Sequence, residues 1–254
     1  MDQQRLIDWL AKHPIFKSQD LKAYLESERM TYIHLKRLLK EGKIRKLPFN
    51  LYGVLNHDGK LIASVEDVAC GVNDDAYIVG IYACHFHDIT VSDLDTLMIS
   101  VEKAFKSVEV EGILFKPKQE PKRMYLIETE GRRYTDYLDT VLDLIEYLDK
   151  WLSLDAFLIA LSSTRVIETE TLLTRLTERN KHILYQKCGL LAEIGQLKVT
   201  NQSVFVNECL QQIGESSRFF SKEAKDTGVY VKKWQMVVSE TLVNQNNMIK
   251  EDRQ

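Results

Sequence analysis

Residues 30–54, MTYIHLKRLLKEGKIRKLPFNLYGV, carry the two signals that decide the fold of the N-terminal region. The first half has the apolar spacing of a helix of about ten residues, with Thr31 as its cap and Gly42 as its stop. The second half contains two short strands, KIRKL and LYGVL, on either side of Pro48-Phe49-Asn50. The stretch therefore predicts a helix that runs directly into a β-hairpin.

Two further helices are predicted upstream of this stretch. Residues 3–12 have helical apolar spacing and are followed by Pro14, which ends a helix. Ser18 can cap a second helix, SQDLKAYLES. Three short helices followed by a hairpin is the order of a winged helix-turn-helix, which we predict over residues 1–58.

The third helix has two different faces. Its leucines form a narrow stripe that can bury against the first two helices: Leu35, Leu38 and Leu39. The opposite face carries one apolar and three cationic side chains at i, i+3, i+4 and i+7 spacing: Ile33, Lys36, Arg37 and Lys40. An apolar side chain on a cationic face suits the major groove of DNA, where it can touch a thymine methyl group.

This face and the hairpin form the predicted interface with double-stranded DNA. Arg37 has the fork geometry for a guanine edge or a phosphate, whereas lysines suit phosphates. The candidate DNA-binding residues are Thr31, Tyr32, Ile33, Lys36, Arg37, Lys40, Arg45 and Lys46. A solvated basic face that binds nothing is the alternative.

The distribution of charge agrees with a polyanion at the N-terminal end. Residues 1–60 contain 12 Lys and Arg against 7 Asp and Glu, a net charge of +5, whereas residues 61–254 carry a net charge of −8. The longest apolar run, residues 76–84, is too short to cross a bilayer, which needs about 20 residues. The N-terminus lacks the pattern of a secretory signal, so we expect a cytoplasmic protein without a membrane partner.

Residues 59–254 have a different pattern from the N-terminal region. Helices are predicted over residues 61–69, residues 75–87 and most of residues 134–195, and strands at LMISV, VEGILFK, RMYLIET and KWQMVVS. We therefore predict an α+β or α/β fold with two domains, residues 1–58 and residues 59–254.

The segment Cys84-His85-Phe86-His87-Asp88 contains residue types that bind metals. His85 and His87 are two residues apart at the end of a predicted helix, so their side chains point in different directions. The cysteines at positions 70, 84, 188 and 209 have no CxxC spacing and are predicted to be reduced thiols. We expect no metal and no cofactor.

Carboxylates raise the alternative of a metal-dependent nuclease fused to the winged helix. Glu109 and Glu111 lie on a predicted strand, and Glu120-Pro121-Lys122 has the ExK form, although proline does not fit a central strand. A second acidic set recurs along one predicted helix and is interpreted as a solvated face: Asp139, Asp143, Glu146 and Asp149. We expect no enzymatic activity.

The sequence resembles the AbiEi family, the antitoxins of type IV toxin–antitoxin operons that act in abortive infection and phage defence. The resemblance is carried by LKRLLKEGKIRKL and LYGVL near the N-terminus, by AYIVGIYACHFHDIT, and by DKWLSLDAFLIALSS, LLTRLTERNKHILYQKCGLLAEIG and KWQMVVSETL in the C-terminal half. The sequence departs from the family at Leu138-Asp139, where Glu-Arg is usual, and at Ser239, where proline is usual.

The resemblance implies a transcriptional repressor and an antitoxin. Its winged helix would bind inverted repeats in the promoter of its own operon. Its C-terminal domain, residues 59–254, would counteract a nucleotidyltransferase-like toxin without a stable complex. The residues themselves leave two alternatives open, the nuclease fusion and a repressor that responds to a small ligand.

Overall fold

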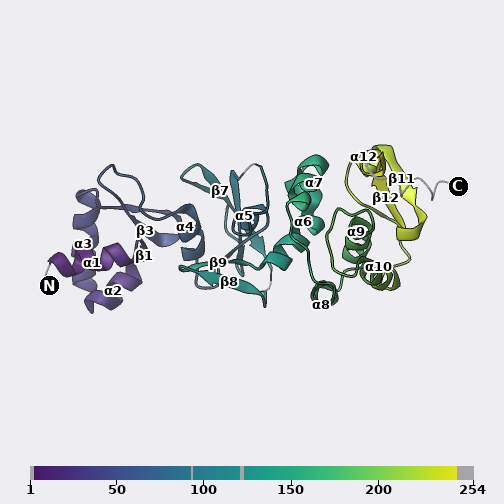
Figure 1. Cartoon of the computed structure of the whole chain (residues 1–254). Coiled ribbons are helices and arrows are strands. Elements are labelled where there is room, and N and C mark those ends of the chain that lie inside the picture. Colours follow the sequence, from purple (N-terminus) through teal and green to yellow (C-terminus); the bar gives the residue numbers. More distant parts are fainter. Residues whose placement is uncertain (1–2, 93, 121–122, 245–254) are drawn as a thin grey trace. The chain divides into compact units, whose positions relative to one another are not determined.

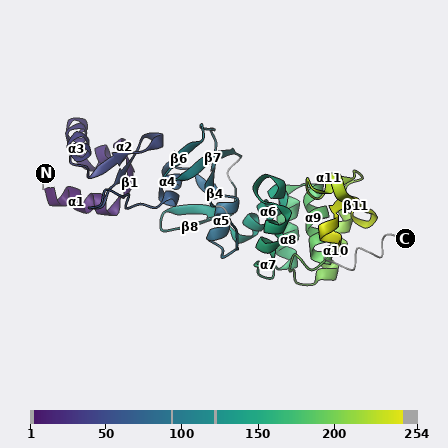
Figure 2. The same cartoon turned by 90° about the horizontal axis from the view of Figure 1, so that it is seen from above.

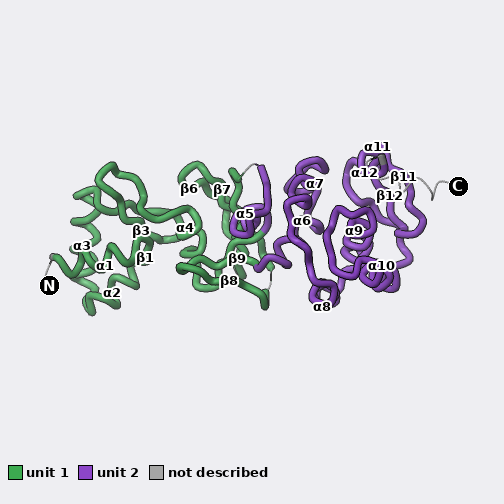
Figure 3. The backbone as a smooth tube through the Cα atoms, viewed as in Figure 1, with its two compact units in different colours: residues 1–79, 94–135 green, residues 80–93, 136–254 purple. Residues whose placement is uncertain are grey.

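The computed structural model describes residues 3–92, 94–120 and 123–244, and its fold is mixed α+β. Contacts divide the chain into two compact units (Figure 3). Unit 1 comprises residues 1–79 and 94–135, and unit 2 comprises residues 80–93 and 136–254. This division differs from the boundary after residue 58 that the sequence predicts, and the separate N-terminal domain stays a prediction.

The N-terminal segment of unit 1 alternates short helices and strands (Figures 1 and 2). Its elements are α1 (Gln3–Lys12), β1 (Ile15–Lys17), α2 (Ser18–Leu25), α3 (Glu28–Lys40), β2 (Ile44–Lys46), the 3-10 turn η1 (Pro48–Asn50) and β3 (Leu51–Val54). The strands form an antiparallel sheet in the order β1-β3-β2. The sequence predicted these helices and the hairpin; strand β1 was missed because three residues carry too little periodicity.

Apolar residues from each helix and each strand of this segment share one core. Leu6 and Leu10 of α1, Leu21 of α2 and Leu35 of α3 pack with Phe16 of β1. In the sheet, Phe16 lies opposite Tyr52 and their rings stack at 5.6 Å between centroids. The helices thus cover one face of the small sheet, and α3 is held by its buried stripe.

The rest of unit 1 is a mixed six-stranded sheet with helix α4 (Val65–Gly71). Its strand order is β6-β7-β5-β4-β9-β8, and the strands are β4 (Tyr77–Val79), β5 (Thr96–Val101), β6 (Val108–Val110), β7 (Ile113–Gln119), β8 (Leu126–Thr129) and β9 (Arg132–Thr135). The predicted helix over residues 75–87 is wrong for its first part, because Tyr77–Val79 pairs with two neighbouring strands. Gly80, at φ 74°, then turns the chain into a short helix.

Unit 2 is mainly helical, as predicted for residues 134–195. Its helices are α5 (Ile81–His85), α6 (Tyr137–Trp151), α7 (Leu154–Ser162), α8 (Thr169–Arg179), α9 (His182–Glu193), α10 (Gln202–Gln211), α11 (Ala224–Thr227) and α12 (Glu240–Asn244). A small sheet closes the unit in the order β10-β12-β11, with β10 (Arg218–Phe219), β11 (Gly228–Val231), the 3-10 turn η2 (Lys232–Trp234) and β12 (Met236–Ser239). Among the described residues, no helix has the length and apolarity to cross a membrane.

The LYQK segment of α9 and the tryptophan near the C-terminus pack against each other. Residues 184–192 are all buried, and a Cβ on Gly189 would collide with the Trp234 ring. The Gln186 side chain donates to the Trp234 carbonyl at 3.1 Å, and the Trp234 indole donates to Glu193 Oε2 at 2.6 Å. These two sequence features are therefore parts of one core contact.

Candidate nucleic-acid interface

Helix α3 begins one turn earlier than predicted. Ser27 is the cap, and its hydroxyl accepts a hydrogen bond from the Met30 backbone N–H at 3.3 Å. Thr31, the predicted cap, lies inside the helix with 5% of its surface exposed, and its hydroxyl donates to the Ser27 carbonyl at 2.7 Å. The prediction that Thr31 caps the helix is therefore wrong, and the hydroxyl of this candidate DNA-binding residue is turned back onto the helix.

The buried stripe of α3 also differs by one position from the prediction. Leu35 and Leu38 are buried in the N-terminal core as expected. Leu39 is 40% exposed, and Thr31 takes the third buried position. The stripe is thus one helical column, and Leu39 belongs to the edge of the opposite face.

The opposite face of α3 is exposed and contains most of the predicted residues. Tyr32 is 66% exposed and Ile33 is 44% exposed, and the side chains of Lys36 and Lys40 are also exposed. Because the helix starts at Glu28, Arg29 joins this face one turn before Ile33. The candidate set missed Arg29, although a serine at position 27 is a recognisable cap signal.

We call Arg29, Tyr32, Ile33, Lys36 and Lys40 the α3 face. Its three cations follow i, i+7 and i+11 spacing, so they lie in one row about 16 Å long. Among the described residues, no hydrogen bond or ion pair is found for the side chains of these cations. The face therefore presents uncompensated positive charge beside exposed apolar side chains.

The acidic residues at the two ends of α3, Glu28 and Glu41, form ion pairs with other residues. Glu28, in the first turn, pairs with Lys22 at 3.1 Å. Glu41, just after the helix, pairs with Lys43 at 2.9 Å and with the Arg37 Nε at 3.8 Å, and its hydrogen bond to Lys43 holds the pKa of the Glu41 carboxyl below its usual value. Arg37 is half-buried at the edge of the α3 face. Together with its contact to Glu41, this makes it less available to a partner than the lysines are.

The hairpin is tied to the six-stranded sheet of the same unit. Arg45 forms an ion pair with Glu111, in the turn between β6 and β7. Phe49, at the hairpin tip, meets Phe105 edge to face with ring centroids 4.8 Å apart. Of the two predicted hairpin cations, Lys46 is exposed, and no side-chain partner is found for it among the described residues. Arg45 is thus partly neutralised within the chain.

The predicted Cys-His segment does not form a cluster of ligands. Cys84 is fully buried in α5, and burial raises the pKa of its thiol to about 12, whereas His85 is exposed. His87 packs edge to face on Tyr137, with centroids 5.7 Å apart. Among the described residues, no group of three or more His, Cys, Asp and Glu is placed to hold a metal ion. All four cysteines are buried with free thiols.

Two of the three glutamates considered for a nuclease are engaged in ion pairs, whereas Glu109 is exposed. Glu111 pairs with Arg45, and Glu120 pairs with Lys118 at 2.9 Å and with Arg123 at 3.0 Å. The Tyr77 hydroxyl donates to Glu120 at 3.3 Å. Pro121 and Lys122 lie outside the described residues, so the ExK segment is described only at Glu120.

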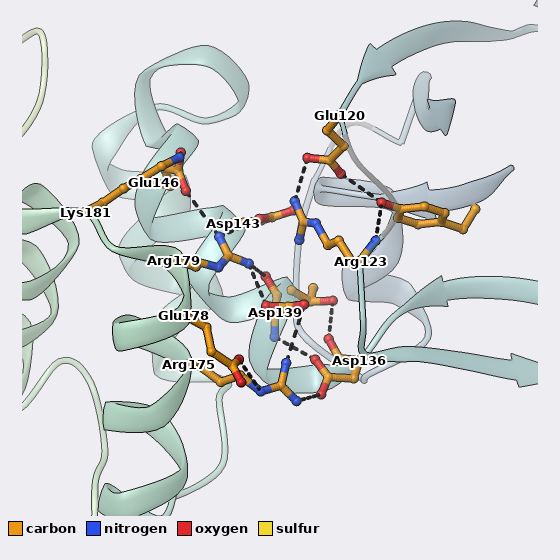
Figure 4. Close-up of polar contacts among 12 residues, drawn as sticks. Glu120, Arg123, Asp136, Asp139, Asp143, Glu146, Arg175, Glu178, Arg179 and Lys181 are labelled. Carbon is orange, nitrogen blue, oxygen red and sulfur yellow. Dashed lines mark hydrogen bonds and ion pairs between the residues drawn. The ribbon is translucent and has the colours of Figure 1, made fainter. Parts of the chain in front are cut away.

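The acidic residues of α6 form a buried network with arginines of α8, and the interpretation as a solvated face is wrong for Asp139 and Asp143. Asp139 is buried and Asp143 is 0% exposed. Arg179 contacts Asp139 Oδ1 at 2.8 Å and Asp143 Oδ1 at 2.9 Å, while Arg175 contacts Asp136 Oδ2 at 2.6 Å (Figure 4). This network joins α6 to α8 within unit 2.

Comparison with known proteins shows a likeness of fold. No family model matches the sequence, and no curated protein matches it. Among solved structures, the chain matches the crystal structure of the RV2827C protein from Mycobacterium tuberculosis with a TM-score of 0.61 and 11% sequence identity. The match covers 95% of this chain and 93% of that chain, so the likeness extends over both units.

Proposed function

We propose that this chain is a DNA-binding repressor whose N-terminal segment is a winged helix and whose α3 face enters the major groove. The observation that carries the proposal is a row of three cations on an exposed helix face, beside Tyr32 and Ile33, for which the described part of the chain supplies no partner. A face that served only solubility would not need two large apolar side chains in the centre of its charge. The order of helices and strands from α1 to β3 supports the same proposal.

The positions of these residues suggest how a site would be recognised. Residues near the N-terminus of a recognition helix contact base edges, which assigns this role to Arg29 and Ile33. Arginine can bond guanine through two hydrogen bonds, and isoleucine can contact a thymine methyl group. Lys36 and Lys40, further along the row, would neutralise phosphates and supply most of the affinity.

The test is a salt series of gel shifts with a duplex from the chain's own promoter. We expect Arg29→Ala to cost about 1–3 kcal/mol on the specific site and to reduce the preference for it. Lys40→Gln should weaken binding to all sequences alike and reduce the slope of log affinity against log salt by about 1. Lys60→Gln, an exposed lysine of the same unit outside the α3 face, is the control with an equal change of charge. If Arg29→Ala and Lys40→Gln bind like the control, the proposal is wrong.

For the rest of the chain we propose the role that the family resemblance implies, an AbiEi-type antitoxin in a type IV system. The departures from the family pattern fall on the α6 network, at Asp139, and on β12, at Ser239, and both residues are buried. These departures therefore lie in the interior of unit 2 and not on a surface that a toxin could contact. The chain would counteract a nucleotidyltransferase-like toxin without holding it in a stable complex.

Coexpression separates the two parts of the proposal. A nucleotidyltransferase-like protein encoded beside this chain should arrest growth alone and should be tolerated when the full chain is present. The Lys36→Gln/Lys40→Gln variant should lose repression of a promoter reporter and still protect against the toxin. If the full chain represses the promoter reporter but gives no protection against the toxin, it is a plain repressor and the antitoxin role is contradicted.

A further inference from the structure

A polar cavity lies between the start of α2 and the hairpin of unit 1. Its volume is about 370 Å³, within the size range of small-ligand sites. Two lysines line it from different elements, Lys17 at the end of β1 and Lys46 at the end of β2. The other polar side chains that line it are Ser18, Gln19, Asn50 and Tyr52.

The charges around this cavity favour an anion. None of its lining residues is acidic. No partner is found for the Lys46 ammonium among the described residues, and Lys17 has a 3.6 Å contact with Asp74, whose carboxylate is fully exposed. A surface pair of this kind contributes roughly 0–1 kcal/mol, so it leaves Lys17 free to turn to a stronger partner.

The cavity also supplies hydrogen-bond donors of the kind that bind phosphate oxygens. Hydroxyls from Ser18 and Tyr52 and side-chain amides from Gln19 and Asn50 can donate to phosphate oxygens, while two lysines neutralise its charge. The lysines belong to β1 and β2, the two outer strands of the small sheet, so one phosphate between them would bridge the sheet.

We infer that this cavity holds a phosphate group of the DNA backbone, and the inference rests on the proposed function. A duplex bound at the α3 face would then have a second point of attachment that carries no sequence information and fixes the orientation of the helix in its groove. The inference assigns Lys17 to the interface, a residue that belongs to neither the α3 face nor the predicted set.

Ethylation interference on the bound duplex tests this assignment, because each ethyl group neutralises one phosphate. We compare the full chain with Lys17→Gln, Lys46→Gln and the control Lys60→Gln. A phosphate whose ethylation weakens binding of the parent should lose that effect in both cavity variants, and it should be the same phosphate in both. The control should keep the complete pattern, and Lys40→Gln should lose a different phosphate.

The outcomes separate this inference from the proposed function. If the duplex binds and the cavity variants give the pattern of Lys60→Gln, the cavity assignment is wrong while the α3 face stands. If no promoter duplex binds, both are wrong. Titration with inorganic pyrophosphate tests for a free phosphate ligand. If pyrophosphate binding requires Lys17 and Lys46 while both cavity variants keep the interference pattern of the parent, the assignment to the DNA backbone is wrong.

Discussion

Replacing Arg179 with glutamine should strongly destabilise unit 2. Its guanidinium lies 2.8 Å from Asp139 Oδ1, 2.9 Å from Asp143 Oδ1 and 3.2 Å from Glu146 Oε2. Asp143 is fully buried, so glutamine would remove the Arg179 charge from beside a carboxylate in the interior. Removing one partner of a buried ion pair costs about 3–5 kcal/mol, and the same value is expected here because Arg179 is itself largely buried.

Urea unfolding of the full chain measures this effect through the shift in the midpoint at a constant m value. The matched control is Lys181→Gln, since Lys181 pairs with Glu146 of the same network from the surface. That pair should contribute at most about 1 kcal/mol. Adding Asp143→Asn to the Arg179→Gln variant should recover part of the loss, because the amide removes the buried charge that Arg179 neutralised.

Two results would refute this reasoning. The first is a loss for Arg179→Gln that is no larger than the loss for Lys181→Gln. The second is a double variant with Asp143→Asn that is less stable than Arg179→Gln alone, which would mean that the penalty comes from lost packing. The first result would indicate that the network is accessible to water, contrary to the burial of Asp143.

Three further predictions concern packing, pH and the hairpin. Gly189→Ala should cost about 1–3 kcal/mol in urea unfolding, because its Cβ would collide with the indole packed on it. Gly214→Ala should change little, because its Cβ would make only ordinary contacts with His182, the nearest at 3.6 Å. Burial lowers the pKa of the His34 imidazole below 6.5, so the unfolded chain binds this proton more tightly than the folded chain. The free energy of unfolding should therefore fall as pH drops below about 6.5, and this dependence should be weaker in His34→Gln. Glu111→Gln should free Arg45 and give a several-fold gain in duplex affinity with a steeper salt dependence, and an unchanged salt slope would contradict this.

The local pattern of α3 was predictable, and its start was not. The leucine spacing places a helix correctly, because Leu35 and Leu38 repeat at the interval of one turn and both are buried. The cap depends on which hydroxyl meets the free N–H groups, and both Ser27 and Thr31 suit that position in sequence. Choosing Ser27 adds a turn and brings Arg29 into the row of cations, so one capping choice changed the composition of the candidate site.

The buried network of unit 2 shows why an acidic helix face cannot be interpreted from its own spacing. The positions of Asp139 and Asp143 show that they share a face of α6, and spacing says no more than that. Arg179, which neutralises them, lies 36 residues after Asp143 and reaches it only because α8 packs beside α6. A long-range partner of this kind has no local signal, so a solvated face and a buried network have the same pattern in sequence.

The hairpin likewise has partners far away in the sequence, and they change which of its residues are expected to contact DNA. Arg45 and Lys46 were both predicted to bind DNA, but successive residues of a strand point to opposite faces of a sheet. Lys46 lines the cavity, whereas Arg45 pairs with Glu111. With Phe49 also packed on Phe105, the hairpin is fixed against the rest of unit 1. Its contribution to an anionic partner should therefore come from Lys46 acting with Lys17, and sequence recognition should come from the α3 face.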